Sequence, residues 1–118
     1  MTIICYPRCS TCKNAETFLQ NHELSYTYRD IKTQNPTKEE LTELYKQSGL
    51  PIRRFFNTSG QLYRAHHLKD RLPSMSDDEA LTLLGSDGML VKRPILITDD
   101  RVLVGFKESE WKTLLEEA

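Results

Sequence analysis

The sequence Cys9-Ser10-Thr11-Cys12 follows a short apolar run, Ile3-Ile4-Cys5, and precedes a stretch in which apolar residues recur at helical spacing. The two thiols therefore lie where a buried strand passes into a helix. Helix N-termini carry partial positive charge and unpaired N–H donors, and this environment favours a thiolate over a thiol. Residues three apart on a helix lie on the same face, so an intramolecular disulfide is within reach.

Within this pair, Cys9 comes first at the expected helix end and is the better placed nucleophile, and Cys12 is the expected resolving thiol. Arg8 adds positive potential that would favour an anion. One alternative is a pair of buried, inert cysteines. A second is zinc, which needs four ligands, whereas the chain offers this pair plus His66-His67, and adjacent histidines do not face the same way. We therefore expect no bound metal.

Composition excludes several classes of protein. The 118 residues suit one domain, and the net charge of −1, from 16 basic and 17 acidic residues, gives no general attraction to nucleic acid or to an anionic membrane. No apolar run approaches the roughly 18 residues that cross a bilayer. The amino-terminal residues lack the features of an export signal, so we expect a cytoplasmic protein, in which a disulfide is transient and chemical.

The two ends of the chain predict a sheet. A strand at 2–5, a helix from Ser10 and a strand over 24–31 form a β-α-β unit, which favours parallel strands. Strands at 95–98 and 102–104 are joined by a short turn and predict an antiparallel hairpin, with a final helix after it. This order predicts an α/β fold with a thioredoxin-like, glutaredoxin-type mixed sheet.

The middle of the chain, about 36–90, predicts a helical insert within a single domain spanning 1–118. Capping boxes at Thr37–Glu40 and Ser76–Glu79 open two helices, and Gly49 ends the first. Residues 52–72 give no clear period beyond one short helix at their start.

Arg93-Pro94 is the second chemical signal. Pro94 immediately precedes a strand that should lie beside the thiols. In a thioredoxin-like fold a proline at that point is often cis, which its tertiary amide permits at modest cost. Arg93 would then present its guanidinium to an oxyanion in a bidentate geometry. The alternative is a solvated arginine next to a turn proline; the Cys9–Cys12 pair favours the anion-binding interpretation. Cys5, at the end of a buried strand, is expected in the core.

Several motifs together resemble the ArsC/Spx family, which includes glutaredoxin-dependent arsenate reductases and the transcriptional regulator Spx. They are Pro7-Arg8-Cys9-Ser10-Thr11-Cys12-Lys13-Asn14, Asn35-Pro36, Gly49-Leu50-Pro51 and Arg93-Pro94-Ile95, in this order. The resemblance covers essentially the whole chain. It implies a thioredoxin-like fold with a helical insert, Cys9 as the nucleophile, and Arg93 as an oxyanion-binding residue.

The resemblance also implies partners. As an enzyme, the chain would reduce a small oxyanion or a disulfide, with no bound cofactor and with glutathione, glutaredoxin or thioredoxin as reductant. As a regulator, it would bind RNA polymerase through a Cys9–Cys12 redox switch. Three positions differ from the arsenate reductase pattern. Cys5 stands where the pattern has a histidine, and Asn57 and Phe106 stand where it has arginines. Lys107, next to Phe106, can supply the missing positive charge.

Overall fold

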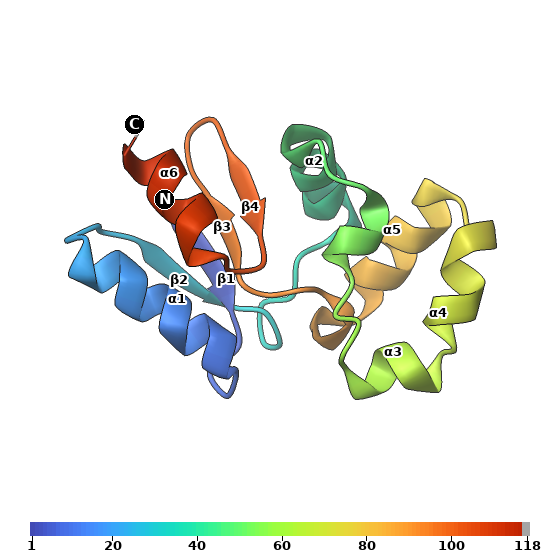
Figure 1. Cartoon of the computed structure of the whole chain (residues 1–118). Helices are drawn as coiled ribbons and strands as arrows, with labels where there is room; N and C mark the ends of the chain where they lie inside the picture. Colours follow the sequence, from blue (N-terminus) through green and yellow to red (C-terminus); the bar gives the residue numbers. More distant parts are fainter. Residues whose placement is uncertain (117–118) are drawn as a thin grey trace.

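The computed structural model describes residues 1–116 and contains a four-stranded mixed sheet with helices on both faces (Figure 1). Its strands lie in the order β2-β1-β3-β4 and comprise β1 (Thr2–Cys5), β2 (Thr27–Asp30), β3 (Ile95–Ile97) and β4 (Val102–Val104). β1 is parallel to β2 and antiparallel to β3, and β3 and β4 form an antiparallel hairpin. The predicted α/β, thioredoxin-like arrangement is confirmed. The last two residues of the predicted domain, 117 and 118, lie outside the described part of the chain.

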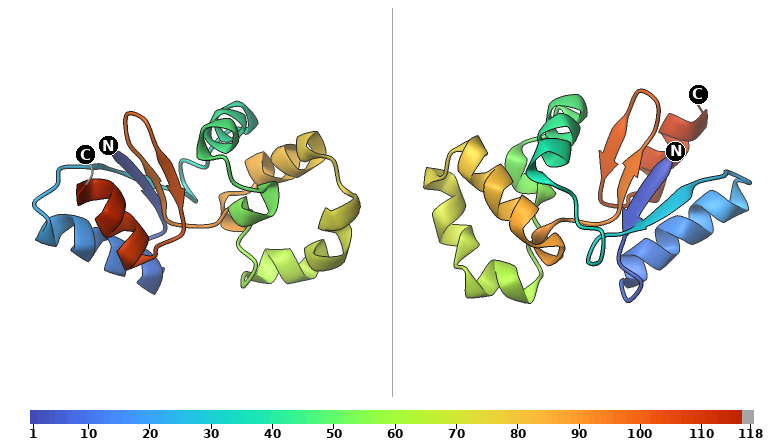
Figure 2. Two further views of the ribbon diagram at one scale, coloured as in Figure 1. Left: turned by 45° about the horizontal axis from the view of Figure 1, so that its top comes forward. Right: turned by 180° about the vertical axis from the view of Figure 1, so that it is seen from behind.

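One face of the sheet is covered by α1 (Ser10–Asn21) and α6 (Glu108–Glu116), which lie side by side in Figure 2. Ile3 and Cys5 of β1 point to this face and pack in one core cluster with Cys12 and Trp111. Trp111 is fully buried, and its indole N–H donates to the carbonyl oxygen of Gly105 at 3.2 Å. The first turn of α6 is thereby tied to the residue that follows the hairpin.

The other face receives the helical segment between β2 and β3, which extends away from the sheet and gives the molecule extents of 41 × 27 × 24 Å (Figure 1). Its elements are α2 (Lys38–Ser48), η1 (Ile52–Phe55), α3 (Gln61–Ala65), α4 (Leu68–Arg71), η2 (Leu72–Ser74), α5 (Asp77–Ser86) and η3 (Gly88–Leu90). Ile4 points to this side, as the alternation of a strand requires, and joins Leu41 and Ile95 in a second core cluster. None of the helices within 1–116 has both the length and the apolar character needed to cross a membrane.

The predicted helix boundaries in the insert have the hydrogen bonds expected of them. The Thr37 hydroxyl accepts from the Glu40 N–H, and the Glu40 carboxylate accepts from the Thr37 N–H. Ser76 and Glu79 form the same reciprocal pair at α5. Gly49 ends α2 in the left-handed conformation, with φ of 68°. Side-chain capping therefore sets the starts of α2 and α5, and the backbone freedom of Gly49 sets the end of α2.

The structure differs from the sequence-based prediction in two places. β2 begins at Thr27 rather than residue 24, because the chain turns at Glu23, where φ is 56°. Residues 61–74, where the sequence gives no clear period, form three short helices, and a left-handed His67 with φ of 53° lies between the first two. Helices of only three to five residues are too short to generate an apolar period.

Gly88 provides a test of how closely the insert packs on the sheet. A Cβ at this position would collide with the backbone carbonyl oxygen of Ile31, just beyond β2. We predict that Gly88→Ala lowers the free energy of unfolding by about 3 kcal/mol or more, at the upper end of overpacking costs. The measurement is urea unfolding followed by circular dichroism.

Gly49→Ala is the matched control, because nothing lies within 4 Å of the added Cβ and only the left-handed backbone is penalised. That penalty is about 1 kcal/mol. Equal losses in the two variants would contradict the close contact at Gly88.

Candidate active site

Cys9 is held at the N-terminus of α1 by a tight turn that follows β1. Its N–H donates to the Tyr6 carbonyl oxygen at 3.0 Å, and its own carbonyl accepts from the Lys13 N–H at 3.1 Å. The backbone of Cys9 is extended, as at an N-cap, but its side chain makes no capping hydrogen bond. The sulfur is half-buried and remains available for chemistry at the positive end of the helix.

Cys12 lies one turn further along α1 and is buried. Burial raises the pKa of Cys12, but four neighbouring groups lower it by a larger amount. They are the Cys5 thiol, the Tyr6 N–H, which lies 3.5 Å from the Cys12 sulfur, the Cys9 thiol and the charge of Arg93. They lower the pKa of Cys12 from 9.0 to about 7. A large fraction of Cys12 is therefore thiolate at neutral pH, behind the more exposed Cys9.

Arg93 lies beside this turn. The Arg93–Pro94 peptide bond is cis, the conformation that the sequence suggests. The guanidinium carbon lies 5.3 Å from the centroid of the Tyr6 ring. Its Nη1 atom is buried and has no hydrogen-bond partner within residues 1–116. A buried donor of this kind normally has an acceptor, so a bound anion would satisfy it.

Cys9 and Arg93 line the same pocket, which encloses about 540 Å³ between the sheet and the insert. Arg64 of α3 and Lys92 bring two further cations to its wall. The other lining residues are Thr11, Asn57, Ser59, Gly60, Gln61, Leu62 and Met89, and none of the lining side chains is a carboxylate. The pocket therefore offers a sulfur nucleophile and positive charge in one place.

The remaining predicted anion-binding residues are located elsewhere. Arg8 and Lys107 are exposed and are not among the residues that line this pocket. Asn57, at the position where the family pattern has an arginine, does line it and accepts a hydrogen bond from the Ser59 hydroxyl at 3.3 Å. Arg64 was missed from the sequence because the segment around it gave no helical period.

The three cysteines are all free thiols. Within the described residues, no group of three or more His, Cys, Asp or Glu side chains is arranged to hold a metal ion.

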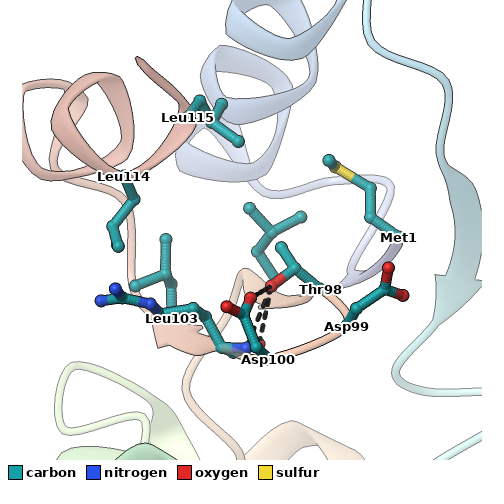
Figure 3. Close-up of a pocket in the computed structure, with 9 residues that line it drawn as sticks. Met1, Thr98, Asp99, Asp100, Leu103, Leu114 and Leu115 are labelled. Carbon is teal, nitrogen blue, oxygen red and sulfur yellow. Dashed lines mark hydrogen bonds between the residues drawn. The ribbon is translucent and has the colours of Figure 1, made fainter. Parts of the chain in front are cut away.

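A second pocket, of about 290 Å³, lies at the opposite end of the sheet, beside the start of β1 (Figure 3). Met1, Leu103 and Leu114 supply much of its wall. At its rim the Thr98 hydroxyl donates to the Asp100 carboxylate at 3.3 Å. Its lining contains no cysteine.

Comparison with known proteins places this site in a family. The model of the ArsC family matches residues 5–114, a span that includes all three cysteines and Arg93. The chain belongs to the ArsC family.

Relatives within the ArsC family carry different names. The chain is 47% identical over 112 residues to the uncharacterized protein YusI of Bacillus subtilis, covering 95% of each. It is 26% identical over 115 residues to the global transcriptional regulator Spx of Staphylococcus epidermidis, covering 98% of this chain and 86% of Spx.

Solved ArsC-type structures agree with the fold. An ArsC family related protein from Bacteroides fragilis superposes with a TM-score of 0.93 at 46% identity, covering 96% of this chain and 95% of the other. An arsenate reductase from Vibrio cholerae gives a TM-score of 0.79 at 25% identity, covering 98% and 97%. A protein named as an arsenate reductase therefore shares this fold.

The lowered pKa of Cys12 gives a direct test. We predict that the ultraviolet absorbance of thiolate rises with a midpoint near pH 7, as the pKa of Cys12 is about 7. Cys12→Ser should remove this rise, whereas Cys9→Ser should keep it because a serine hydroxyl can still donate to Cys12. A rise near pH 7 that survives Cys12→Ser would contradict the assignment.

The same pKa predicts how stability depends on pH. Because the pKa of Cys12 in the folded chain lies below its ordinary 9.0, its thiolate stabilises the fold above pH 9, and this contribution is lost as pH falls through about 7. The free energy of unfolding should therefore rise between these two pH values. Urea unfolding at several pH values checks this, with Cys12→Ser as the variant in which the rise disappears.

Proposed function

We propose that this chain is a cytoplasmic thiol-disulfide oxidoreductase of the arsenate reductase-like type, with Cys9 as nucleophile and Cys12 as resolving thiol. The observation that carries the proposal is the position of Cys9. It opens onto a pocket with Lys92 and Arg93 in its wall, and Cys12 follows it in the first turn of α1. A nucleophile, a second thiol and an anion-binding wall are the parts that such a reduction needs.

The steps follow thiol–disulfide exchange. With a disulfide substrate, the Cys9 thiolate bonds to one sulfur and the other sulfur leaves as a thiolate, which takes a proton from solvent. The Cys12 thiolate then attacks Cys9, forming the Cys9–Cys12 disulfide and releasing the second substrate thiol. Glutathione, glutaredoxin or thioredoxin supplies the two electrons that reopen this disulfide. No bound cofactor takes part.

With arsenate, Cys9 bonds to arsenic and one oxygen leaves as water. Attack of Cys12 or glutathione on the Cys9 sulfur then leaves arsenic as arsenite, and the two electrons come from the two thiols that become a disulfide. Arg93 holds the oxyanion through its unpartnered Nη1, and Lys92 and Arg64 add positive charge from the two sides of the pocket. The similarity to the Vibrio cholerae arsenate reductase supports this choice of substrate.

We predict that Cys9→Ser abolishes turnover of both arsenate and a small neutral disulfide, measured with glutathione and glutaredoxin. Arg93→Ala should lower kcat/KM for arsenate about 100-fold, the cost of losing one oxyanion donor, and should leave the neutral disulfide nearly unaffected. Arg101→Ala is the matched control, since Arg101 is exposed and is not among the residues that line the Cys9 pocket. Turnover that survives Cys9→Ser would remove Cys9 from the nucleophile role.

A second candidate function is redox-dependent regulation. It is favoured by the similarity to the global transcriptional regulator Spx of Staphylococcus epidermidis, which this chain matches over 98% of its length. In this role the chain would bind RNA polymerase, and the Cys9–Cys12 disulfide would change that binding. The near-neutral net charge of −1 fits a protein partner better than direct contact with DNA.

A pull-down with purified RNA polymerase separates the two candidates. In the regulatory case, the oxidised and reduced chain should bind polymerase with different affinities, and Cys12→Ser should abolish this difference because the disulfide cannot form. Equal absence of binding in both redox states, together with arsenate or disulfide turnover, would leave only the enzymatic proposal.

A further inference from the structure

Arg93 lines the same pocket as Cys9, but its guanidinium lacks the polar contacts that usually hold an arginine in place. Its Nη1 atom is buried and has no hydrogen-bond partner within residues 1–116, and none of the salt bridges found there includes Arg93. An arginine side chain has many rotamers, and fixing one of them costs conformational entropy. Some other contact must therefore keep the guanidinium in the pocket wall.

The aromatic ring of Tyr6 makes that contact. The guanidinium carbon of Arg93 lies over the ring, 5.3 Å from its centroid, which is within the range of a cation–π interaction. A ring face accepts the cation without occupying any of the five N–H donors of the guanidinium in an ordinary hydrogen bond. A carboxylate in the same place would accept from those donors and neutralise the charge. The ring therefore supports the cation and leaves it able to bind an anion.

The position of Tyr6 is itself fixed by its surroundings. Tyr6 directly follows β1, and its side chain packs against the core cluster on the insert side of the sheet, which contains Ile4 and Ile95. Its N–H donates to the Cys12 sulfur at 3.5 Å, and its carbonyl oxygen accepts from the Cys9 N–H at 3.0 Å. The same residue thus holds the main chain of the nucleophile and contacts the cation that lines the pocket with it.

We propose that Tyr6 is a positioning residue whose ring holds the Arg93 guanidinium in the pocket wall, with its N–H donors free for the anionic group of the substrate. Tyr6 is not among the residues that line the Cys9 pocket, whereas Arg93 is, so the ring acts through the guanidinium and does not touch the substrate. This inference rests on the proposed function and deepens it. No bond to Tyr6 forms or breaks during the reaction.

Two competing roles for Tyr6 lead to different expectations. As a residue that only fills space in the core, Tyr6 would change the stability of the fold and would alter the reactions of Cys9 with anionic and neutral reagents alike. As a proton donor in the reaction, it would need its hydroxyl group. Substitutions that remove the whole ring, or the hydroxyl group alone, therefore separate these roles from the positioning of Arg93.

The test uses four variants of the full chain. Tyr6→Leu and Tyr6→Met both remove the ring and keep an apolar side chain at this position, and the flexible methionine adapts to the space left by the ring. Tyr6→Phe keeps the ring and removes only the hydroxyl group. Tyr28→Leu is the matched control, because Tyr28 is an exposed tyrosine of β2 that also does not line the Cys9 pocket. Urea unfolding establishes that each variant is folded.

The first measurement compares the alkylation of Cys9 by iodoacetate, an anion, and by neutral iodoacetamide, with peptide mapping to assign the modified cysteine. Both reagents react with the thiolate, so the ratio of the two rates is independent of the thiolate fraction and reports the positive charge beside the sulfur. This ratio should fall about fivefold in Tyr6→Leu and Tyr6→Met, as expected for the loss of one cation–π contact. Tyr6→Phe and Tyr28→Leu should keep the native ratio.

A double substitution tests whether the ring acts through the guanidinium. Arg93→Ala alone should lower the alkylation ratio at least as far as Tyr6→Leu does, and adding Tyr6→Leu to Arg93→Ala should lower it no further. The kinetic counterpart is kcat/KM for arsenate, which should fall about fivefold in Tyr6→Leu for the same reason. Turnover of a small neutral disulfide by Tyr6→Leu should stay near that of the native chain.

An unchanged alkylation ratio in both Tyr6→Leu and Tyr6→Met would overturn the proposal. A fall of the same size in Tyr6→Phe would overturn it as well, and so would a further loss when Tyr6→Leu is added to Arg93→Ala. The alkylation ratio requires no turnover, so these results are independent of the proposed function, which fails instead if Cys9→Ser keeps its activity.

Discussion

The backbone of Tyr6 connects the parts on which the site depends. Its carbonyl accepts the Cys9 N–H and closes the turn that places one sulfur at the start of α1. Its N–H donates to the sulfur of Cys12. Its ring lies against the guanidinium of Arg93. One residue between a strand and a helix therefore fixes the nucleophile, stabilises the second thiol and supports the cation in front of them.

In this arrangement the more exposed thiol and the thiol with the lowered pKa are two different residues. Cys9 is the sulfur that a substrate can reach, whereas Cys12 is the buried sulfur whose pKa is lowered by surrounding donors. Burial alone would oppose a charge at Cys12, and the short-range hydrogen bonds outweigh it. The insert completes the site from the other side, because Arg64 on α3 faces the same pocket as Cys9. The sheet thus supplies the sulfur chemistry, and the sheet and insert together supply the charge that would select an anion.

Much of this could be predicted from local sequence patterns. The β-α-β unit follows from a strand of branched residues and the helical spacing after Cys12, and Thr37 and Ser76 mark helix starts through their capping boxes. The role of Arg64 could not be predicted, because it lies in a five-residue helix whose position depends on tertiary packing. The sequence also does not reveal that Cys5 and Cys12 belong to one core cluster, because this depends on how the turn after β1 places α1 against the sheet.

The burial of Trp111 has an optical consequence. It is the only tryptophan in the chain, and it lies on the face of the sheet that α1 and α6 cover, in the cluster that contains Cys5 and Cys12. Phe106 packs edge-on against it, with ring centroids 4.8 Å apart. Tryptophan fluorescence, excited selectively over the tyrosines, therefore observes the sulfur-bearing half of the molecule alone. Melting of the insert by itself would lower the helical circular dichroism while leaving the emission spectrum in its buried, short-wavelength form, so the two signals can follow the two halves separately.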